Sequence, residues 1–173
     1  MCGITGINNY RSGAPAELGL TNPQPSDVLN EEKVRFAITT HYWNSCVDSL
    51  NICQFVFGPA WQLFSPNQLV EVVRAVTGWD VTIEELSRLG ERRLTMMRVF
   101  NAREGFDCQD DTLPPKLHQA LAGGKSDGAR VTKEEIEWAK DWYYRLAGWD
   151  ANTGNPTRAK LEALGLEWIA GEI

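Results

Sequence analysis

Three helix-start signals constrain the fold of this chain more than any other feature. Ser65 is a favoured capping residue, and Pro66 follows it at the first helical position, where a missing N–H costs little. Residues 82–85 (TIEE) and 132–135 (TKEE) are capping boxes, in which a threonine and a glutamate three residues later satisfy each other's backbone N–H groups. Apolar residues recur at helical spacing behind these signals, and strand alternation is absent. We therefore predict an all-α, irregular multi-helix domain.

The same pattern predicts the domain organisation and the helix boundaries. Residues 1–25, rich in Gly, Asn and Pro, are expected to form an extended arm or connector, and residues 26–173 the helical domain. Ser26 is expected to open the first helix. The expected helices are 26–45, 66–77, 83–100, 115–121, 133–147 and 157–164. The expected buried stripe of the third helix consists of Leu86, Leu89, Leu94, Met97 and Phe100.

Length and charge limit the classes of partner. The chain has 173 residues, enough for one domain with a core, and a net charge of −6. This charge argues against nucleic acid or an anionic membrane as the main partner. No apolar run approaches the roughly 20 residues that span a bilayer, and no signal peptide is visible. We expect a cytoplasmic protein.

The cysteines are too scattered to form a metal centre by themselves. Cys2, Cys46, Cys53 and Cys108 include no C-x-x-C pair. Self-contained zinc and iron–sulfur sites usually cluster their ligands in the sequence. If one of these thiols binds a cluster, the other ligands must come from elsewhere.

One short segment combines groups suited to cofactor binding. Residues 48–53 (DSLNIC) hold a carboxylate, a turn-forming asparagine and a thiol at the end of a helical pattern. Asp48 is able to accept hydrogen bonds from the ring N–H groups of a heterocycle. Cys53 is able to ligate soft iron. From the residues alone, a turn-forming aspartate and a buried inert thiol are the competing interpretations.

The segment resembles the pterin-binding motif Asp-x-x-Gly-Leu-Cys of the tungsten-containing aldehyde ferredoxin oxidoreductases. Further motifs of that family follow in the family's order and at similar spacing between residues 26 and 166. They are residues 90–92 (GER), 98–105 (RVFNAREG), 110–114 (DDTLP), 143–144 (YY), 148–150 (GWD), 154–157 (GNPT) and 164–166 (LGL). The chain thus resembles the C-terminal helical domain of these enzymes.

The resemblance implies a set of cofactors and a role for four residues. The family holds tungsten, or molybdenum, between two pterins beside one [4Fe–4S] cluster, and passes electrons from aldehyde oxidation to ferredoxin. Asp48 corresponds to the pterin-contacting aspartate and Cys53 to the fourth cluster ligand. Asn51 stands where the motif has glycine, and Asn tolerates the left-handed conformation. Ile52 stands where the motif has a leucine whose backbone faces the pterin.

The resemblance also implies partners. The family's N-terminal domain, its cysteine triplet and its first pterin motif have no counterpart here, so the chain is expected to be a fragment or a separate subunit. The remaining domains, ferredoxin and a small aldehyde are the implied partners, and the isolated chain is expected to be inactive. The resemblance assigns no catalytic residue, and His41 and His118 receive no such role.

Alternatives remain at this level. The start, residues 1–6 (MCGITG), resembles class II glutamine amidotransferases, in which Cys2 becomes the nucleophile, but their downstream motifs and strand-rich fold have no counterpart in the sequence. A cofactor-free assembly or interaction module is a second alternative. A relative that reduces aromatic thioesters is a third. Four arginines, namely Arg92, Arg93 and Arg98 on the third expected helix and Arg103 just after it, are predicted to form ion pairs rather than to contact cofactor phosphates.

Overall fold

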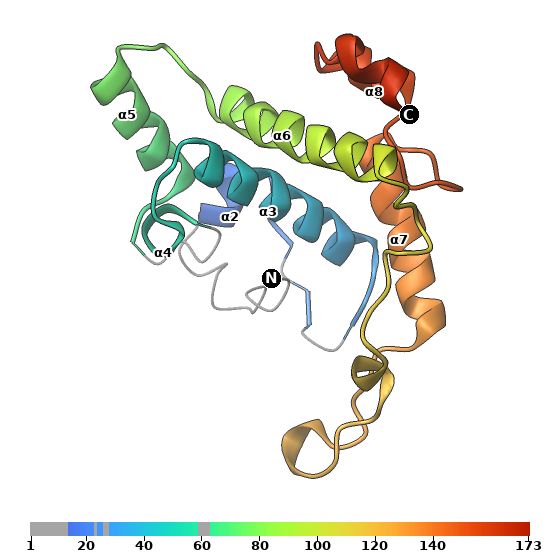
Figure 1. Ribbon diagram of the computed structural model, residues 1–173. Coiled ribbons are helices and arrows are strands. Elements are labelled where there is room, and N and C mark those ends of the chain that lie inside the picture. Colours follow the sequence, from blue (N-terminus) through green and yellow to red (C-terminus); the bar gives the residue numbers. More distant parts are fainter. Residues whose placement is uncertain (1–13, 23, 26–27, 59–62) are drawn as a thin grey trace. The chain divides into compact units, whose positions relative to one another are not determined.

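The described part of the chain is built from helices. The computed structural model describes residues 14–22, 24–25, 28–58 and 63–173, and these contain no strand beyond an isolated bridge between Trp149 and Pro156 (Figure 1). The all-α prediction is confirmed. The α-helices are α2 (Ala14–Glu17), α3 (Glu31–Ser49), α4 (Gln54–Phe57), α5 (Pro66–Thr77), α6 (Ile83–Arg103), α7 (Lys133–Ala147) and α8 (Arg158–Ala163). Short 3₁₀ helices are η2 (Pro115–His118), η3 (Gly124–Ser126) and η4 (Glu167–Glu172).

The described residues form two compact units. The first holds the residues up to Val28 together with Arg35–Met97, and the second holds Leu29–Val34 and Arg98–Ile173. The predicted boundary between an arm and a domain near residue 25 stays a prediction. Within the predicted arm, α2 is a short helix, and Pro15 and Leu20 are buried.

The core of the first unit lies where α3, α5 and α6 meet, and α3 and α6 run side by side there (Figure 1). Trp43 is 1% exposed, and its indole Nε1 donates a hydrogen bond to the carbonyl of Phe57 at 3.1 Å. This bond ties α3 to the end of α4 and so fixes the chain between them, which contains the Asp48–Cys53 segment. The buried members of this core are Trp43, Cys46, Val47, Leu69, Val70, Val73 and Leu86.

The predicted helix-start signals are confirmed in detail. Ser65 and Gln68 form a capping box at the start of α5, and Thr132 and Glu135 form one at the start of α7. At the start of α6, the Thr82 N–H donates to the Glu85 carboxylate at 2.8 Å. The Glu85 N–H donates to Thr82 Oγ1 at 3.2 Å. Local sequence therefore sets where these helices begin.

Three helix predictions are wrong. The expected helix at residues 115–121 is the short 3₁₀ helix η2, which ends at His118. The first long helix begins at Glu31, not Ser26, which lies outside the described residues; the Lys33 N–H donates to Asn30 Oδ1 at 3.0 Å and caps it there. The buried stripe of α6 is also different, because Leu89, Met97 and Phe100 are exposed. Its buried residues are Leu86, Gly90, Thr95, Arg98 and Val99.

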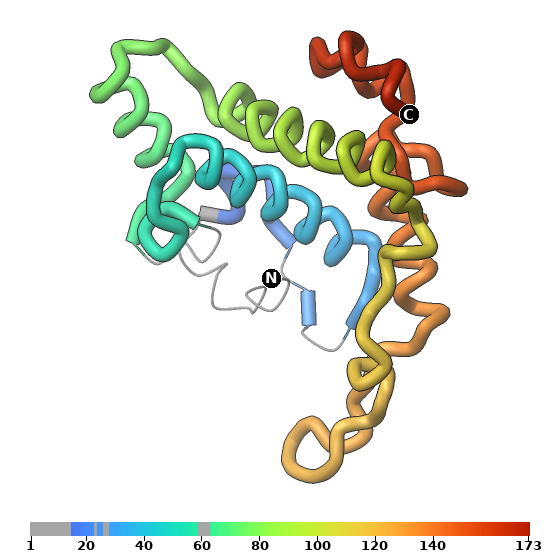
Figure 2. Tube along the Cα trace, in the orientation of Figure 1, coloured from blue at the N-terminus to red at the C-terminus, as the bar shows by residue number. Residues whose placement is uncertain are grey.

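The second unit has its own core at the chain's C-terminal helices. Thr157 caps α8 as predicted, with its Oγ1 accepting from the Lys160 N–H at 3.2 Å. The α8 and η4 segments pack together (red in Figure 2). The buried members of this core are Val99, Leu161, Leu164, Leu166 and Ile169. Among the described helices, none combines the length and apolarity needed to cross a membrane.

Candidate functional site

The Asp48–Cys53 segment is a helix end followed by a tight reversal of the backbone. Asn51 has a φ of 55°, in the left-handed region. The Asn51 N–H donates to the Asp48 carbonyl at 3.1 Å, and the Ile52 N–H donates to the Val47 carbonyl at 3.3 Å. This pair of bonds is the Schellman arrangement that ends many helices, with Asn51 in the position usually held by glycine. The predicted left-handed tolerance of Asn51 is confirmed.

Ile52 anchors this turn to the first core. Its side chain is half-buried and packs against the buried cluster that contains Val47. A hydrophobic contact between these two positions often accompanies a Schellman end. The β-branched side chain is therefore accommodated, and the backbone of the turn has a defined course.

Asp48 is a partly exposed carboxylate with two donors, one on each oxygen. Its Oδ1 accepts a hydrogen bond from Gln54 Nε2, and its Oδ2 accepts one from Arg93 Nη1 at 3.2 Å. The side chains of Arg93 and Asp48 are 38% and 36% exposed. An ionised carboxylate has about four lone-pair positions. Acceptor capacity therefore remains for a ligand.

Sequence reasoning missed both partners of Asp48. The arginines of α6 were expected to form ion pairs, and Arg93 does so, but its partner is the candidate pterin-binding residue itself. No pattern links positions 48 and 93, because the contact depends on how α3 packs against α6. Gln54 follows Cys53 directly, so a local hydrogen bond back to Asp48 was the more predictable contact.

The three described cysteines lie in different environments. Cys53 is exposed at the start of α4 and makes no capping hydrogen bond. Cys46 is completely buried, and burial raises its pKa from 9.0 to about 12, as suits a core thiol. Cys108 is half-buried, and its Sγ donates to the Asn152 carbonyl at 2.9 Å. The competing interpretation of Cys53 as a buried thiol is therefore wrong, and Cys46 is a core residue. Cys2 lies outside the described residues.

The donor types at the segment fit the implied cofactors, but only in part. An exposed thiol fits an iron–sulfur cluster, and an exposed carboxylate fits a heterocycle with ring N–H donors. Across residues 14–58 and 63–173, as far as they are described, no group of three His, Cys, Asp or Glu side chains forms a metal site. Cys53 thus offers one thiolate, and a cluster needs further ligands from outside this part of the chain.

The two adjacent carboxylates Asp110 and Asp111 have different partners. Asp110 stabilises a local turn, since its Oδ2 accepts from the Asp107 N–H at 2.9 Å. Asp111 instead binds Arg98, whose side chain is 8% exposed, at 2.9 Å. It also accepts a hydrogen bond from the Tyr144 hydroxyl. The DDTLP motif therefore joins α6 to α7 within the second unit.

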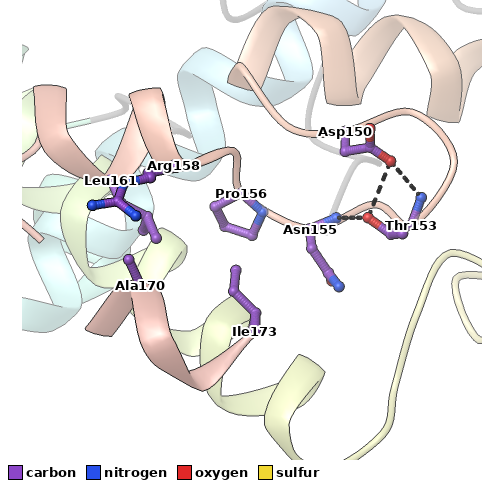
Figure 3. Close-up of a pocket in the computed structure, with 8 residues that line it drawn as sticks. All are labelled: Asp150, Thr153, Asn155, Pro156, Arg158, Leu161, Ala170 and Ile173. Atoms are coloured by element: carbon purple, nitrogen blue, oxygen red, sulfur yellow. Dashed lines mark hydrogen bonds between the residues drawn. The ribbon is translucent and has the colours of Figure 1, made fainter. Parts of the chain in front are cut away.

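A small cavity of about 250 Å³ lies in the second unit. Asp150 and Thr153 on one side of it hydrogen-bond to each other at 3.0 Å and 3.2 Å, and the Asn155 N–H donates to Thr153 Oγ1 (Figure 3). The hydrogen bonds that the Asp150 carboxylate accepts, first from the Thr153 N–H and then from the Asn152 N–H, lower its pKa. The cavity wall is completed by Pro156, Arg158, Leu161, Ala170 and Ile173. Asp150 and Thr153 bond within the loop, and Arg158 pairs with Glu162 in α8, so these contacts stabilise the loop and α8.

Most of the sequence matches a known family. The family described as "Aldehyde ferredoxin oxidoreductase, domains 2 & 3" matches residues 5–166. The chain belongs to this family. The tungsten-containing aldehyde ferredoxin oxidoreductase of Pyrococcus furiosus is 30% identical over 163 residues, which cover 92% of this chain and 25% of that enzyme. The enzyme of the same name from Thermococcus kodakarensis is 29% identical, again over 92% of this chain. The chain therefore spans about a quarter of the length of these relatives.

A solved structure has the same fold. It is the active-site complex BamBC of benzoyl coenzyme A reductase with 1,5-dienoyl-CoA, with a TM-score of 0.66 and 20% identity. The match covers 89% of this chain and 23% of that chain. Family membership and the helical fold contradict the amidotransferase alternative, which requires a strand-rich sandwich.

Proposed function

We propose that this chain is the C-terminal part, as a fragment or a separate subunit, of a bis-pterin oxidoreductase that contains tungsten or molybdenum and a [4Fe–4S] cluster. The proposed reaction oxidises a small aldehyde to a carboxylic acid and passes two electrons to ferredoxin. The observation that carries the proposal is the geometry of the Asp48–Cys53 segment in a chain of this family. An exposed carboxylate and an exposed thiol flank a left-handed turn.

Each residue of the segment has a separate task in this proposal. Asp48 accepts hydrogen bonds from the pterin ring N–H groups, and the backbone at Asn51 and Ile52 follows the pterin edge. Cys53 supplies one thiolate to the cluster, and the other ligands come from the remaining part of the enzyme. When bound, the metal–pterin group supplies the oxygen-transfer and redox chemistry, while the protein binds and orients it.

The proposal requires partners. One cluster thiolate and one pterin contact do not retain these cofactors tightly, so the isolated chain is expected to be inactive. The remaining domains or subunit complete the site, and ferredoxin and the aldehyde bind to the complete enzyme.

A pull-down of the tagged chain from its anaerobic host, with metal analysis, tests the proposal. We expect a larger partner with tungsten or molybdenum and about four iron atoms per complex, as one cubane cluster requires. Cys53→Ala is expected to lose or convert the cluster, whereas Cys108→Ala, which removes a thiol from the second unit, is expected to retain it. An intact [4Fe–4S] signal in Cys53→Ala overturns the ligand assignment. A lone, metal-free protein contradicts a separate subunit of a working oxidoreductase and favours a fragment or an assembly or interaction module.

A further inference from the structure

We propose that Arg93 is a positioning residue that prepares Asp48 to bind the pterin. This inference rests on the proposed function and adds a residue to it. Arg93 lies on α6, and its Nη1 reaches Asp48 Oδ2 at 3.2 Å across the packed helices α3 and α6. The same nitrogen lies 3.3 Å from the Ser45 hydroxyl, to which it donates.

Ser45, which lies about one helical turn before Asp48 on α3, holds the Arg93 guanidinium in place. The Ser45 side chain is buried at 4% exposure, so its hydroxyl provides an immobile acceptor for Arg93. The Ser45 carbonyl in turn accepts a hydrogen bond from the Ser49 hydroxyl at 2.8 Å. Arg93 is thus held at one end by the buried face of α3 and presents its charge to the exposed Asp48.

The need for Arg93 follows from the electrostatics of covering a carboxylate. A flat heterocycle that binds Asp48 removes water from it, and an ionised carboxylate without a counter-charge is costly to desolvate. Arg93 supplies that counter-charge on Oδ2 and fixes the side-chain direction. Gln54 occupies Oδ1 in the same way without adding charge.

The remaining acceptor positions then face a ligand in one orientation. A carboxylate with about four lone-pair positions keeps about two of them after Arg93 and Gln54 are bound. A pterin edge with neighbouring N–H donors matches the two remaining lone-pair positions of a carboxylate whose orientation is already fixed. An Asp48 without Arg93 samples several rotamers and must be ordered at the moment of binding, which weakens binding.

Cofactor content in the complete complex tests this role without an activity measurement. Wild type, Arg93→Met, Arg93→Lys and Asp48→Asn are purified with their partner from the anaerobic host. Pterin is measured by the fluorescence of its oxidised form, and iron is measured separately. Arg93→Met is expected to retain pterin about tenfold less tightly on dilution and gel filtration, because it loses a charged hydrogen bond. Iron is expected to stay at the wild-type level. Arg93→Lys keeps the charge and is expected to recover part of the loss.

The control is Arg145→Met, which removes an exposed ion pair with Asp141 on α7. It is expected to keep both pterin and iron. Wild-type pterin content in Arg93→Met, with a loss in Asp48→Asn, overturns the inference and leaves the proposed function intact. Wild-type content in both variants contradicts the pterin role of Asp48 and the inference together. A parallel loss of pterin and iron in Arg93→Met means that Arg93 acts on folding or assembly, and this also overturns the inference.

Discussion

Gly90 of α6 lies directly against the backbone carbonyl of Tyr42 in α3. A Cβ added at Gly90 overlaps that oxygen and falls 2.8 Å from the Cys46 nitrogen. Both neighbours are helix backbone, which does not move aside as a flexible side chain does. The absence of a side chain at Gly90 therefore sets the close approach of α3 and α6 in the first unit, on which the contact between Arg93 and Asp48 depends.

Gly90→Ala is accordingly expected to destabilise the chain. Overpacking of a tight contact costs about 1–3 kcal/mol, and a clash with backbone places this site at the upper end. Urea unfolding followed by circular dichroism measures the loss. Gly171→Ala is the control, because a Cβ there meets nothing within 4 Å, and its stability is expected to change by less than about 0.5 kcal/mol. Equal stabilities for the two variants contradict the close-approach argument.

The local features of the fold were predictable from the sequence, and the contacts between helices were not. Capping at Ser65, Thr82 and Thr132 depends on residues within one helical turn, so the pattern alone predicts it. The buried face of α6 was predicted wrongly because helix packing places Gly90 and Arg98 inside and leaves Leu89 and Phe100 outside. A prediction from the spacing of apolar residues cannot identify a glycine that packs against a neighbouring helix or an arginine that is buried.

In the candidate site, too, the local turn was predictable from the sequence and the contact between helices was not. The turn at Asn51 follows from the tolerance of asparagine for positive φ, and the sequence predicts it. The partner of Asp48 lies 45 residues away on another helix, at Arg93, and becomes visible only in the folded chain. The cofactor roles of Asp48, Asn51, Ile52 and Cys53 stay predictions from the family resemblance.

Asn51→Gly and Asn51→Ala are expected to have opposite effects. Glycine adopts the left-handed conformation without a Cβ penalty, so Asn51→Gly is expected to equal or slightly exceed wild type in stability. Alanine carries the penalty of about 1 kcal/mol, and Asn51→Ala is expected to lose that much. Urea midpoints of the two variants measure the difference. Asn67→Ala, on the exposed side of α5, controls for loss of the amide. A more stable Asn51→Ala than Asn51→Gly contradicts the turn assignment.

Tyr144 and Asp111 are expected to be energetically coupled. The Tyr144 side chain is 4% exposed, and its hydroxyl donates to the Asp111 carboxylate. Burial, then the bond to Asp111, raises the pKa of Tyr144 above its usual range. Tyr144→Phe is expected to lose about 1.5–3 kcal/mol, as for a hydrogen bond to a charged group.

A double-mutant cycle isolates the interaction free energy between Tyr144 and Asp111. If the contact is stabilising, adding Tyr144→Phe in an Asp111→Asn background is expected to cost clearly less than in the wild type. The free energy of unfolding in urea, at a fixed pH near neutrality, gives the coupling. Additive losses in the double variant contradict the coupling. Arg98 pairs with Asp111 at 2.9 Å, so the single Asp111→Asn change is expected to cost more than Tyr144→Phe.

Cys46 is expected to make the stability of the chain fall in alkaline solution. Burial raises its pKa from 9.0 to about 12, so folding favours the protonated thiol. Its contribution is complete below pH 9.0 and is lost as the pH rises toward 12, because the unfolded chain releases the proton first. The slope is about 1.4 kcal/mol per pH unit within that window. Urea unfolding between about pH 8 and 11 measures it, and Cys46→Ala is expected to give a shallower slope. Other groups titrate equally in both proteins, so identical slopes contradict a buried, neutral Cys46.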